Sequence, residues 1–135
     1  RASAMAGESV AWWHVSTWLR VIRSTFDRRG DGDTEPISEL AMVDTLTRAD
    51  VAVVDDLGAE YMTDWTRSMV YAVVNGRDST MLPTIYTTNL PLDAPKGDSI
   101  ASVYGDRVAS RLSRCVRIVL RDSADLRPRK SSVSP

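Results

Sequence analysis

An apolar run that ends in two adjacent acids is the feature that most constrains this chain. Val51 to Val54 are all apolar, and Asp55 and Asp56 follow them directly. A short apolar run of this kind is typical of a strand buried inside a sheet. In open α/β sheets, ligands bind at the carboxyl ends of the strands. The pattern therefore predicts an α/β fold with chemistry at the end of this strand.

Similar runs elsewhere in the chain extend this expectation to a whole sheet. Further strands are predicted at Ser9–Val15, Thr84–Thr88 and Val116–Leu120. Helices are predicted from Ser16 to about Phe26, Ser38 to Arg48, Thr63 to about Gly76 and Gly105 to Arg114, and an exposed loop over Arg28–Pro36. Alternating strands and helices predict a parallel sheet flanked by helices on both faces.

Composition limits the class of protein. The 135 residues fit one domain, and a hydrophobic share of 43% with 26% charged residues is that of a soluble globular protein. Seventeen basic and eighteen acidic residues nearly cancel, so any nucleic-acid contact must come from a local patch. The single cysteine, Cys115, excludes an internal disulfide, and we expect it to be buried. No apolar run is long enough for a membrane span and no signal peptide opens the chain, which indicates a cytoplasmic protein.

The order of the predicted elements also suggests boundaries. We expect a core over residues 1–126 and a disordered tail over 127–135, where Pro, Ser, Lys and Arg dominate. The chain begins with Arg1 rather than methionine, and we interpret it as a piece of a longer protein.

The acidic pair has a specific chemical interpretation. It matches the Walker B pattern, in which the first acid, here Asp55, holds Mg²⁺ and the second, Asp56, orients the attacking water. A phosphate-accepting receiver domain also places an acidic pair at a strand end. That fold needs another Asp and a Lys at later strand ends, and Thr88-Asn89 and Leu120-Arg121 supply neither. An acid that merely serves a turn is the remaining alternative.

Asn89 follows the next predicted buried strand. A polar residue at this place in P-loop ATPases, called sensor 1, contacts the γ-phosphate and the attacking water. An asparagine amide suits that role because it both donates and accepts hydrogen bonds. The alternative is an asparagine that serves the turn into Pro91.

Four sequence blocks together resemble a known family, the AAA+ ATPases of the DnaC/DnaI helicase-loader type, whose close cousins are the IstB-type transposition helpers. The blocks are Asp55–Glu60, Thr63–Trp65, Pro83–Leu90 and Gly105–Leu112, and the resemblance covers roughly Ser9 to Arg127. It implies a P-loop NTPase fold of the AAA+ type, with ATP and Mg²⁺ as cofactors. It also implies an ATPase that assembles side by side and loads a replicative DNA helicase on single-stranded DNA.

The resemblance assigns roles to individual residues. It makes Asp55 the Mg²⁺ ligand, Asp56 the water-orienting acid, Asn89 sensor 1, Arg111 the arginine finger and Arg127 a late nucleotide-sensing arginine. A guanidinium suits a finger because it offers planar donors to the developing phosphate charge. Arg107, one helical turn earlier, is the alternative finger. Arg111 alternatively forms a salt bridge with Asp106 or another acid, and Arg127 is alternatively a solvated tail residue.

The chain departs from the family in one respect. The phosphate-binding motif Gly-x-x-x-x-Gly-Lys-Ser/Thr does not occur in it, and the Lys96-Gly97 pair lies in a predicted loop. We expect that motif upstream of the first strand in a longer protein, and expect this chain by itself to bind ATP poorly. An IstB-type helper, or an adaptor that binds DNA or a partner without nucleotide, are the alternative functions.

Structural roles are expected for four aromatic residues. His14 is expected to be a packed or hydrogen-bonded core histidine, and Trp12 and Trp13 are expected to fill the core on opposite faces of the sheet. Trp65 is expected to pack, with base stacking beside Arg67 as the alternative.

Overall fold

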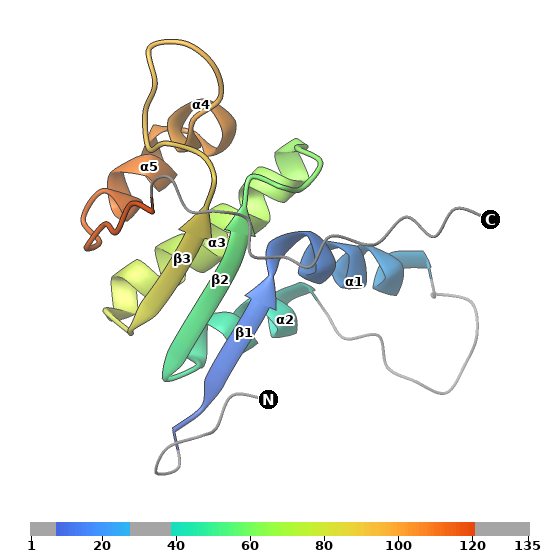
Figure 1. Cartoon of the computed structure of the whole chain (residues 1–135). Coiled ribbons are helices and arrows are strands. Elements are labelled where there is room, and N and C mark those ends of the chain that lie inside the picture. Colours follow the sequence, from blue (N-terminus) through green and yellow to red (C-terminus); the bar gives the residue numbers. More distant parts are fainter. Residues whose placement is uncertain (1–7, 28–38, 121–135) are drawn as a thin grey trace, which may run out of the picture.

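The computed structural model describes residues 8–27 and 39–120 of the chain (Figure 1). Its elements, in order, are β1 (Val10–His14), α1 (Val15–Asp27), α2 (Glu39–Arg48), β2 (Val51–Leu57), α3 (Asp64–Thr80), β3 (Thr84–Thr88), α4 (Ile100–Tyr104) and α5 (Asp106–Leu112). None of the described helices is long and apolar enough to cross a membrane. The predicted loop at Arg28–Pro36, Arg127 and the 127–135 tail all fall outside the described residues.

The three described strands form one parallel sheet in the order β1-β2-β3, which confirms the predicted fold class. Val10 of β1 aligns with Val51 of β2, and Val53 of β2 aligns with Ile85 of β3. Because all strands run the same way, their carboxyl ends meet along one edge of the sheet (Figure 1). Asp55 lies at that edge, directly beside His14 in the register.

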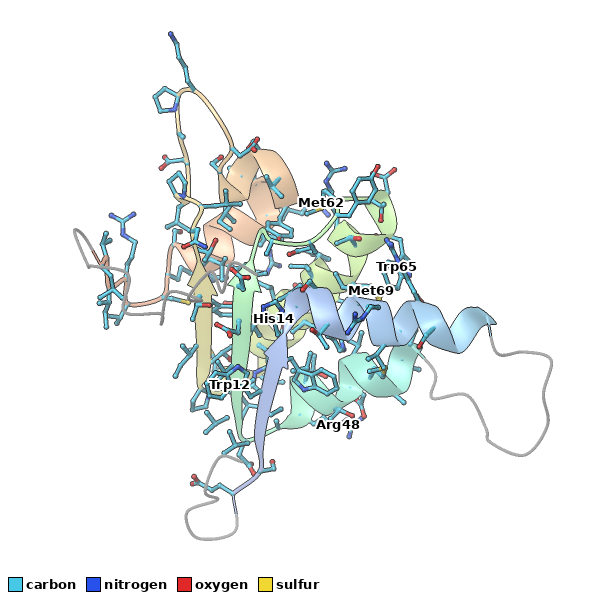
Figure 2. All side chains as sticks on the ribbon, turned by 45° about the vertical axis from the view of Figure 1, so that its right-hand side comes forward. Trp12, His14, Arg48, Met62, Trp65 and Met69 are labelled. Atoms are coloured by element: carbon cyan, nitrogen blue, oxygen red, sulfur yellow. The ribbon has the colours of Figure 1, made fainter. Side chains whose placement is uncertain are left out.

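Helices cover only one face of the sheet in the part of the chain that is described. Ala52 and Val54 point into the core that β2 shares with α1, α2 and α3, and they are 0% and 4% exposed. Trp12 (Figure 2) and Ile85 lie on the opposite face, and they are 64% and 57% exposed. The expectation of helices on both faces, with Trp12 in a core, is therefore wrong for these residues. When parallel strands are neighbours in the order of the sequence and all crossover connections are right-handed, every connecting helix lies on the same face of the sheet.

A buried arginine ties the sheet and helices together at the end away from the acidic pair. Arg77 of α3 is 1% exposed, and its guanidinium donates to backbone carbonyls at both strand entrances. The acceptors are the carbonyl oxygens of Leu46, Thr47, Ala49 and Pro83, together with the Thr84 hydroxyl. Burial lowers the pKa of Arg77. Because these carbonyls end α2 and precede β2 and β3, Arg77 fixes where both strands begin.

Most predicted elements have their expected type, with shifted ends. Thr63 caps α3 as expected, since its side chain accepts a hydrogen bond from the Thr66 backbone N–H. The helix runs four residues beyond the expected Gly76, and Met81 closes it in the left-handed conformation with φ 56°. The short helix α4 was not expected. It begins at a capping box formed by Ser99 and Ser102.

The predicted strand at Val116–Leu120 is wrong. The segment follows α5 without regular structure, and Val116, Ile118 and Leu120 are 94%, 83% and 83% exposed. It does not pair with β3 in the described sheet. A strand needs a neighbour for its backbone groups, and these apolar side chains have no adjacent strand here. Cys115, just before this segment, is exposed rather than buried.

Candidate functional site

The acidic pair lies on a local irregularity at the carboxyl end of β2. The register between β2 and β3 shifts between Val54 and Leu57, as in a β-bulge. Asp56 within this shift has φ 63°, in the left-handed region that residues other than glycine seldom adopt. Such a conformation costs about 1–3 kcal/mol and persists only where neighbouring contacts hold it. The two carboxylates are thereby aimed in different directions.

Thr87 of β3 provides those contacts on one side. Its hydroxyl oxygen lies 2.5 Å from Asp55 Oδ1, to which it donates, and accepts from the Asp56 backbone N–H at 2.8 Å. The next residue, Thr88, donates to the carbonyl of Leu57 at 2.7 Å. The end of β3 therefore fixes the turn that carries both acids. Sequence reasoning recognised this polar strand end but gave Thr87 no separate role.

His14 of β1 approaches the acidic pair from the other side. Its Nε2 lies 3.4 Å from Asp56 Oδ2, and its Nδ1 lies 3.0 Å from the Ser16 hydroxyl. The histidine side chain is 44% exposed, so the expected core position is wrong, whereas a hydrogen-bond partner is present in the Ser16 hydroxyl. His14 is the last residue of β1, and this position alone was a usable signal, because the carboxyl ends of parallel strands share one edge. Figure 2 shows His14 at that end of the strand.

Asn89 follows β3 directly and is exposed. Its side chain makes no hydrogen bond to any residue within 8–27 and 39–120, unlike Thr87 and Thr88 before it. It therefore does not serve the turn through its amide, and that amide is available to a ligand at the same edge of the sheet.

A second set of contacts holds the loop that follows the acids. Gly58 has φ 99°, which favours glycine, and a Cβ atom on it would also displace the Leu90 side chain, 2.6 Å away. Glu60 accepts from the Gly58 backbone N–H and from the hydroxyl of Tyr104 in α4. Burial, followed by the bond to Glu60, raises the pKa of Tyr104. The acidic turn is thus linked to α4.

Of the two candidate finger residues, Arg111 is bound within its own chain. Its guanidinium donates to Asn75 Oδ1 at 2.6 Å, lies 3.5 Å from Asp78 and stacks 5.3 Å from the centre of the Tyr71 ring. The acid beside it is therefore Asp78 of α3 rather than Asp106. Arg107 is exposed, and its side chain contacts no partner in the described part of the chain. Both arginines lie on α5.

This edge of the sheet suits a magnesium ion that is bound mainly by nucleotide phosphates and waters and by few protein side chains. No group of three or more acidic, histidine or cysteine side chains that would enclose a metal occurs in residues 8–27 and 39–120. Mg²⁺ bound with nucleotide does not need such a group, since it takes one or two carboxylates and completes its shell with phosphate oxygens and waters. Thr87 engages only Oδ1 of Asp55, and Oδ2 has no hydrogen-bond partner there. A hard oxygen ligand is therefore available.

Trp65, the other aromatic candidate, lies within α3 (Figure 2). The Arg23 guanidinium stacks 5.1 Å from the centre of its ring, and its indole N–H donates to Glu39. Arg67 turns instead to the carbonyl of Val103 and to Asp64. The structure thus gives Trp65 a packing role between α1, α2 and α3, with Arg23 rather than Arg67 beside it.

Comparison with known proteins bears on this geometry. No protein-family model matches the chain. The chain is 33% identical over 78 residues to the replicative helicase loader DnaI of Bacillus subtilis (strain 168), a match that covers 57% of this chain and 25% of DnaI. A crystal structure of the DnaC helicase loader superposes with a TM-score of 0.56 at 23% identity, over 80% of this chain and 58% of that one.

The chain has the fold of the DnaC helicase loader. The match agrees with the parallel sheet flanked by helices that the sequence predicted. The chain spans only a quarter of the length of DnaI and 58% of the DnaC chain. The fold match therefore covers the sheet and helices that hold the site, and it assigns no chemistry to the residues.

Proposed function

We propose that this chain is the metal-binding and water-orienting part of an AAA+ ATPase of the DnaC/DnaI helicase-loader family. The observation that carries the proposal is the arrangement at the carboxyl edge of the sheet. Asp55 and Asp56 end β2, Asn89 follows β3, and the two strands are neighbours in a helicase-loader fold. A P-loop ATPase needs these three groups side by side.

Each side chain has a distinct task in this proposal. Asp55 holds Mg²⁺, which neutralises phosphate charge when it is bound with ATP. Asp56 orients the attacking water and accepts its proton. Asn89 donates to the γ-phosphate and positions the same water. Thr87 keeps the first two residues in place through its bonds to Asp55 Oδ1 and to the Asp56 backbone.

The phosphates of ATP require a glycine-rich loop that this sequence does not contain. We expect the strand that precedes this loop to pair with the edge of β3 that faces away from β2. In the described residues β3 pairs on one side only, with β2, and the apolar Val116–Leu120 segment lacks a neighbouring strand. An inserted strand gives both of them a backbone partner.

Arg111 acts in this proposal as the finger for a neighbouring subunit's nucleotide, with Arg107 as the alternative. The exposed Arg107 needs no rearrangement, whereas Arg111 has to leave Asn75 and Asp78. Arg127 would sense the nucleotide of its own subunit. The finger function requires side-by-side assembly of subunits, which we place in the cytoplasm.

The partners follow from the family. DnaI is described as a replicative helicase loader, and we propose a replicative DNA helicase as the partner and single-stranded DNA as the site of loading. An IstB-type transposition helper shares the same active-site residues and is an alternative. A nucleotide-independent adaptor is the alternative of another class.

The discriminating experiment begins with the open reading frame that surrounds this chain. A Gly-Lys-Ser/Thr motif within about fifty residues upstream, the length of one βαβ unit, is expected. The protein encoded by that frame should then bind Mg²⁺-ATP and hydrolyse it, with stimulation by single-stranded DNA or by the helicase. An in-frame start without such a motif, or a protein that binds its partner equally well without ATP, contradicts the ATPase and favours the adaptor.

A further inference from the structure

A pair of hydrogen bonds joins the acidic turn, residues 55–59, to the helices that carry the two candidate finger arginines. The hydroxyl of Tyr104 in α4 donates to Glu60 Oε1, and Glu60 Oε2 accepts from the Gly58 backbone N–H at 3.1 Å. Tyr104 is 5% exposed, and burial strengthens a hydrogen bond by excluding competing water. One carboxylate therefore holds the turn with one oxygen and the end of α4 with the other.

On the side of the turn, Glu60 contacts the backbone just after the proposed water-orienting acid. The Asp56 carbonyl accepts from the Ala59 N–H at 3.3 Å, so Asp56 and Gly58 belong to one tight turn. Burial, then the bond to Glu60 and its charge, and to a smaller extent the charge of Asp56, raise the pKa of Tyr104. The hydroxyl therefore stays protonated and remains a donor at neutral pH.

On the side of the helices, Tyr104 is the last residue of α4, and Gly105 alone separates it from α5 (Figure 1). The Gly105 N–H donates to the Ala101 carbonyl in α4 at 2.9 Å, and the Gly105 carbonyl accepts from the Val108 N–H in α5 at 3.1 Å. Because one residue takes part in the hydrogen bonding of both helices, we expect α4 and α5 to move together. Both candidate fingers lie on α5.

The remaining contacts of this helix pair go to α3. Arg67 of α3 donates to the Val103 carbonyl in α4 at 2.8 Å. At the other end of the pair, Arg111 and Arg114 approach Asp78 of α3, at 3.5 and 2.6 Å. Helix α3 thus supports α4 and α5 from one side, and the Tyr104 hydroxyl fixes how they lie against the acidic turn.

We propose that Tyr104 is a positioning residue, which couples the acidic turn of one subunit to the finger that the same subunit offers to its neighbour. This inference rests on the proposed function, since a finger needs a nucleotide in the adjoining subunit. Tyr104 itself touches neither nucleotide nor water in this role. Without its hydroxyl, Glu60 still binds Gly58 and the subunit keeps its own turn, whereas α5 loses a contact that directs its arginines. The defect therefore lies in the neighbouring pocket.

The first arm of the test needs no ATP. Tyr104→Phe keeps the buried ring and removes only the hydroxyl. Amide hydrogen exchange over Asp106–Leu112 should become about fivefold faster, the equilibrium factor of one net hydrogen bond, and the nuclear magnetic resonance signal of the Gly58 amide should shift. Tyr61→Phe is the matched control, since Tyr61 follows Glu60 directly and is 81% exposed. It should leave exchange in α5 unchanged.

The second arm measures hydrolysis in the protein that includes the phosphate loop. Tyr104→Phe should lower kcat about tenfold with an unchanged KM for ATP, because its own pocket is intact. An excess of Asp56→Asn, which is expected to be inactive but offers an intact finger, should return each Tyr104→Phe subunit to nearly the wild-type rate. Glu60→Ala should recover less in the same mixture, because its own turn also loses the bond to Gly58. Tyr61→Phe should match the wild type without any addition.

The outcomes separate this inference from the function on which it rests. Unchanged exchange in α5, or a wild-type kcat, in Tyr104→Phe overturns the coupling and leaves the ATPase intact. A lowered kcat that Asp56→Asn does not restore, although the two proteins co-assemble, places the defect within the subunit itself and also overturns the coupling. A wild-type protein that does not hydrolyse ATP overturns the proposed function and this inference with it.

Discussion

The hydroxyl of Thr87 lies 2.5 Å from the carboxylate of Asp55, across the boundary between β3 and β2. The same oxygen accepts the Asp56 backbone N–H. A single side chain thus bridges both acids of the candidate site, and it comes from the strand that leads into Asn89. The relationship makes the acidic turn and the polar strand end one unit rather than two neighbouring motifs.

Thr87→Val removes this bridge while keeping the shape of the side chain. The Asp55 carboxylate then loses a donor and the Asp56 N–H loses its acceptor, so the free energy of unfolding should fall by about 1–2 kcal/mol. Urea denaturation of the chain measures it. Thr17→Val on the exposed side of α1 is the control, because that hydroxyl has no partner in the described residues. Equal stability of the two variants would contradict a stabilising role for the Thr87 hydrogen bonds to Asp55 and Asp56.

The hydrogen bonds of Arg77, at the opposite end of the sheet, are expected to contribute more to stability. Arg77→Met leaves the carbonyls of Leu46, Ala49 and Pro83 buried without their donor, and the free energy of unfolding should fall by about 3 kcal/mol or more. Arg77→Lys should recover only part of it, because an ammonium cannot span the acceptors that a planar guanidinium reaches. Denaturant unfolding with an unchanged m-value checks both. A lysine variant as stable as the wild type would contradict this role of the Arg77 guanidinium.

A half-buried tyrosine on the core side of β3 predicts how stability depends on pH. Burial raises the pKa of Tyr86 to about 12, whereas an unfolded chain gives ~10. Above pH ~10 the unfolded state releases this proton first, so the stability that Tyr86 contributes is complete below ~10 and is lost as the pH rises toward about 12. Urea midpoints measured across that window should fall less steeply for Tyr86→Phe. Equal slopes in the two proteins contradict this assignment.

The sequence predicted the parallel sheet and its acidic end because apolar runs and helix caps are local signals. Val51–Asp56 and Thr63 needed no knowledge of distant residues. It failed where an element depends on a partner: Val116–Leu120 is apolar enough for a strand but has no described strand beside it. The contact of His14 with Asp56 was missed for the same reason, since it depends on the register between β1 and β2. Asp56 was predicted as a strand-end acid, but its left-handed backbone was not.

The finger assignment is tested by mixing two inactive proteins that include the phosphate loop, Arg111→Ala and Asp56→Asn. A finger acts in trans, so some interfaces in a mixed assembly pair an intact Asp56 with an intact Arg111, and ATP hydrolysis should partly return. Fingers contribute ~10³–10⁵ in rate, which makes even partial rescue measurable.

Arg114→Ala is the matched control for this experiment, because Arg114 also binds Asp78, at 2.6 Å. It should retain activity alone. If Arg114→Ala is as inactive as Arg111→Ala and the mixture shows no rescue despite proven co-assembly, Arg111 serves only to hold Asp78. Arg107→Ala is then mixed with Asp56→Asn in the same way.

The most direct test of the whole account is the Asp56→Asn variant of the protein with its phosphate loop. The amide keeps the shape of the side chain but cannot accept the proton of the attacking water. Mg²⁺-ATP should bind with nearly wild-type affinity, while single-turnover hydrolysis slows by at least ~100-fold, with Asp50→Asn as the control at the far end of β2. Turnover by Asp56→Asn at the wild-type rate would contradict the account, because the acidic end of β2 would then have no part in the chemistry.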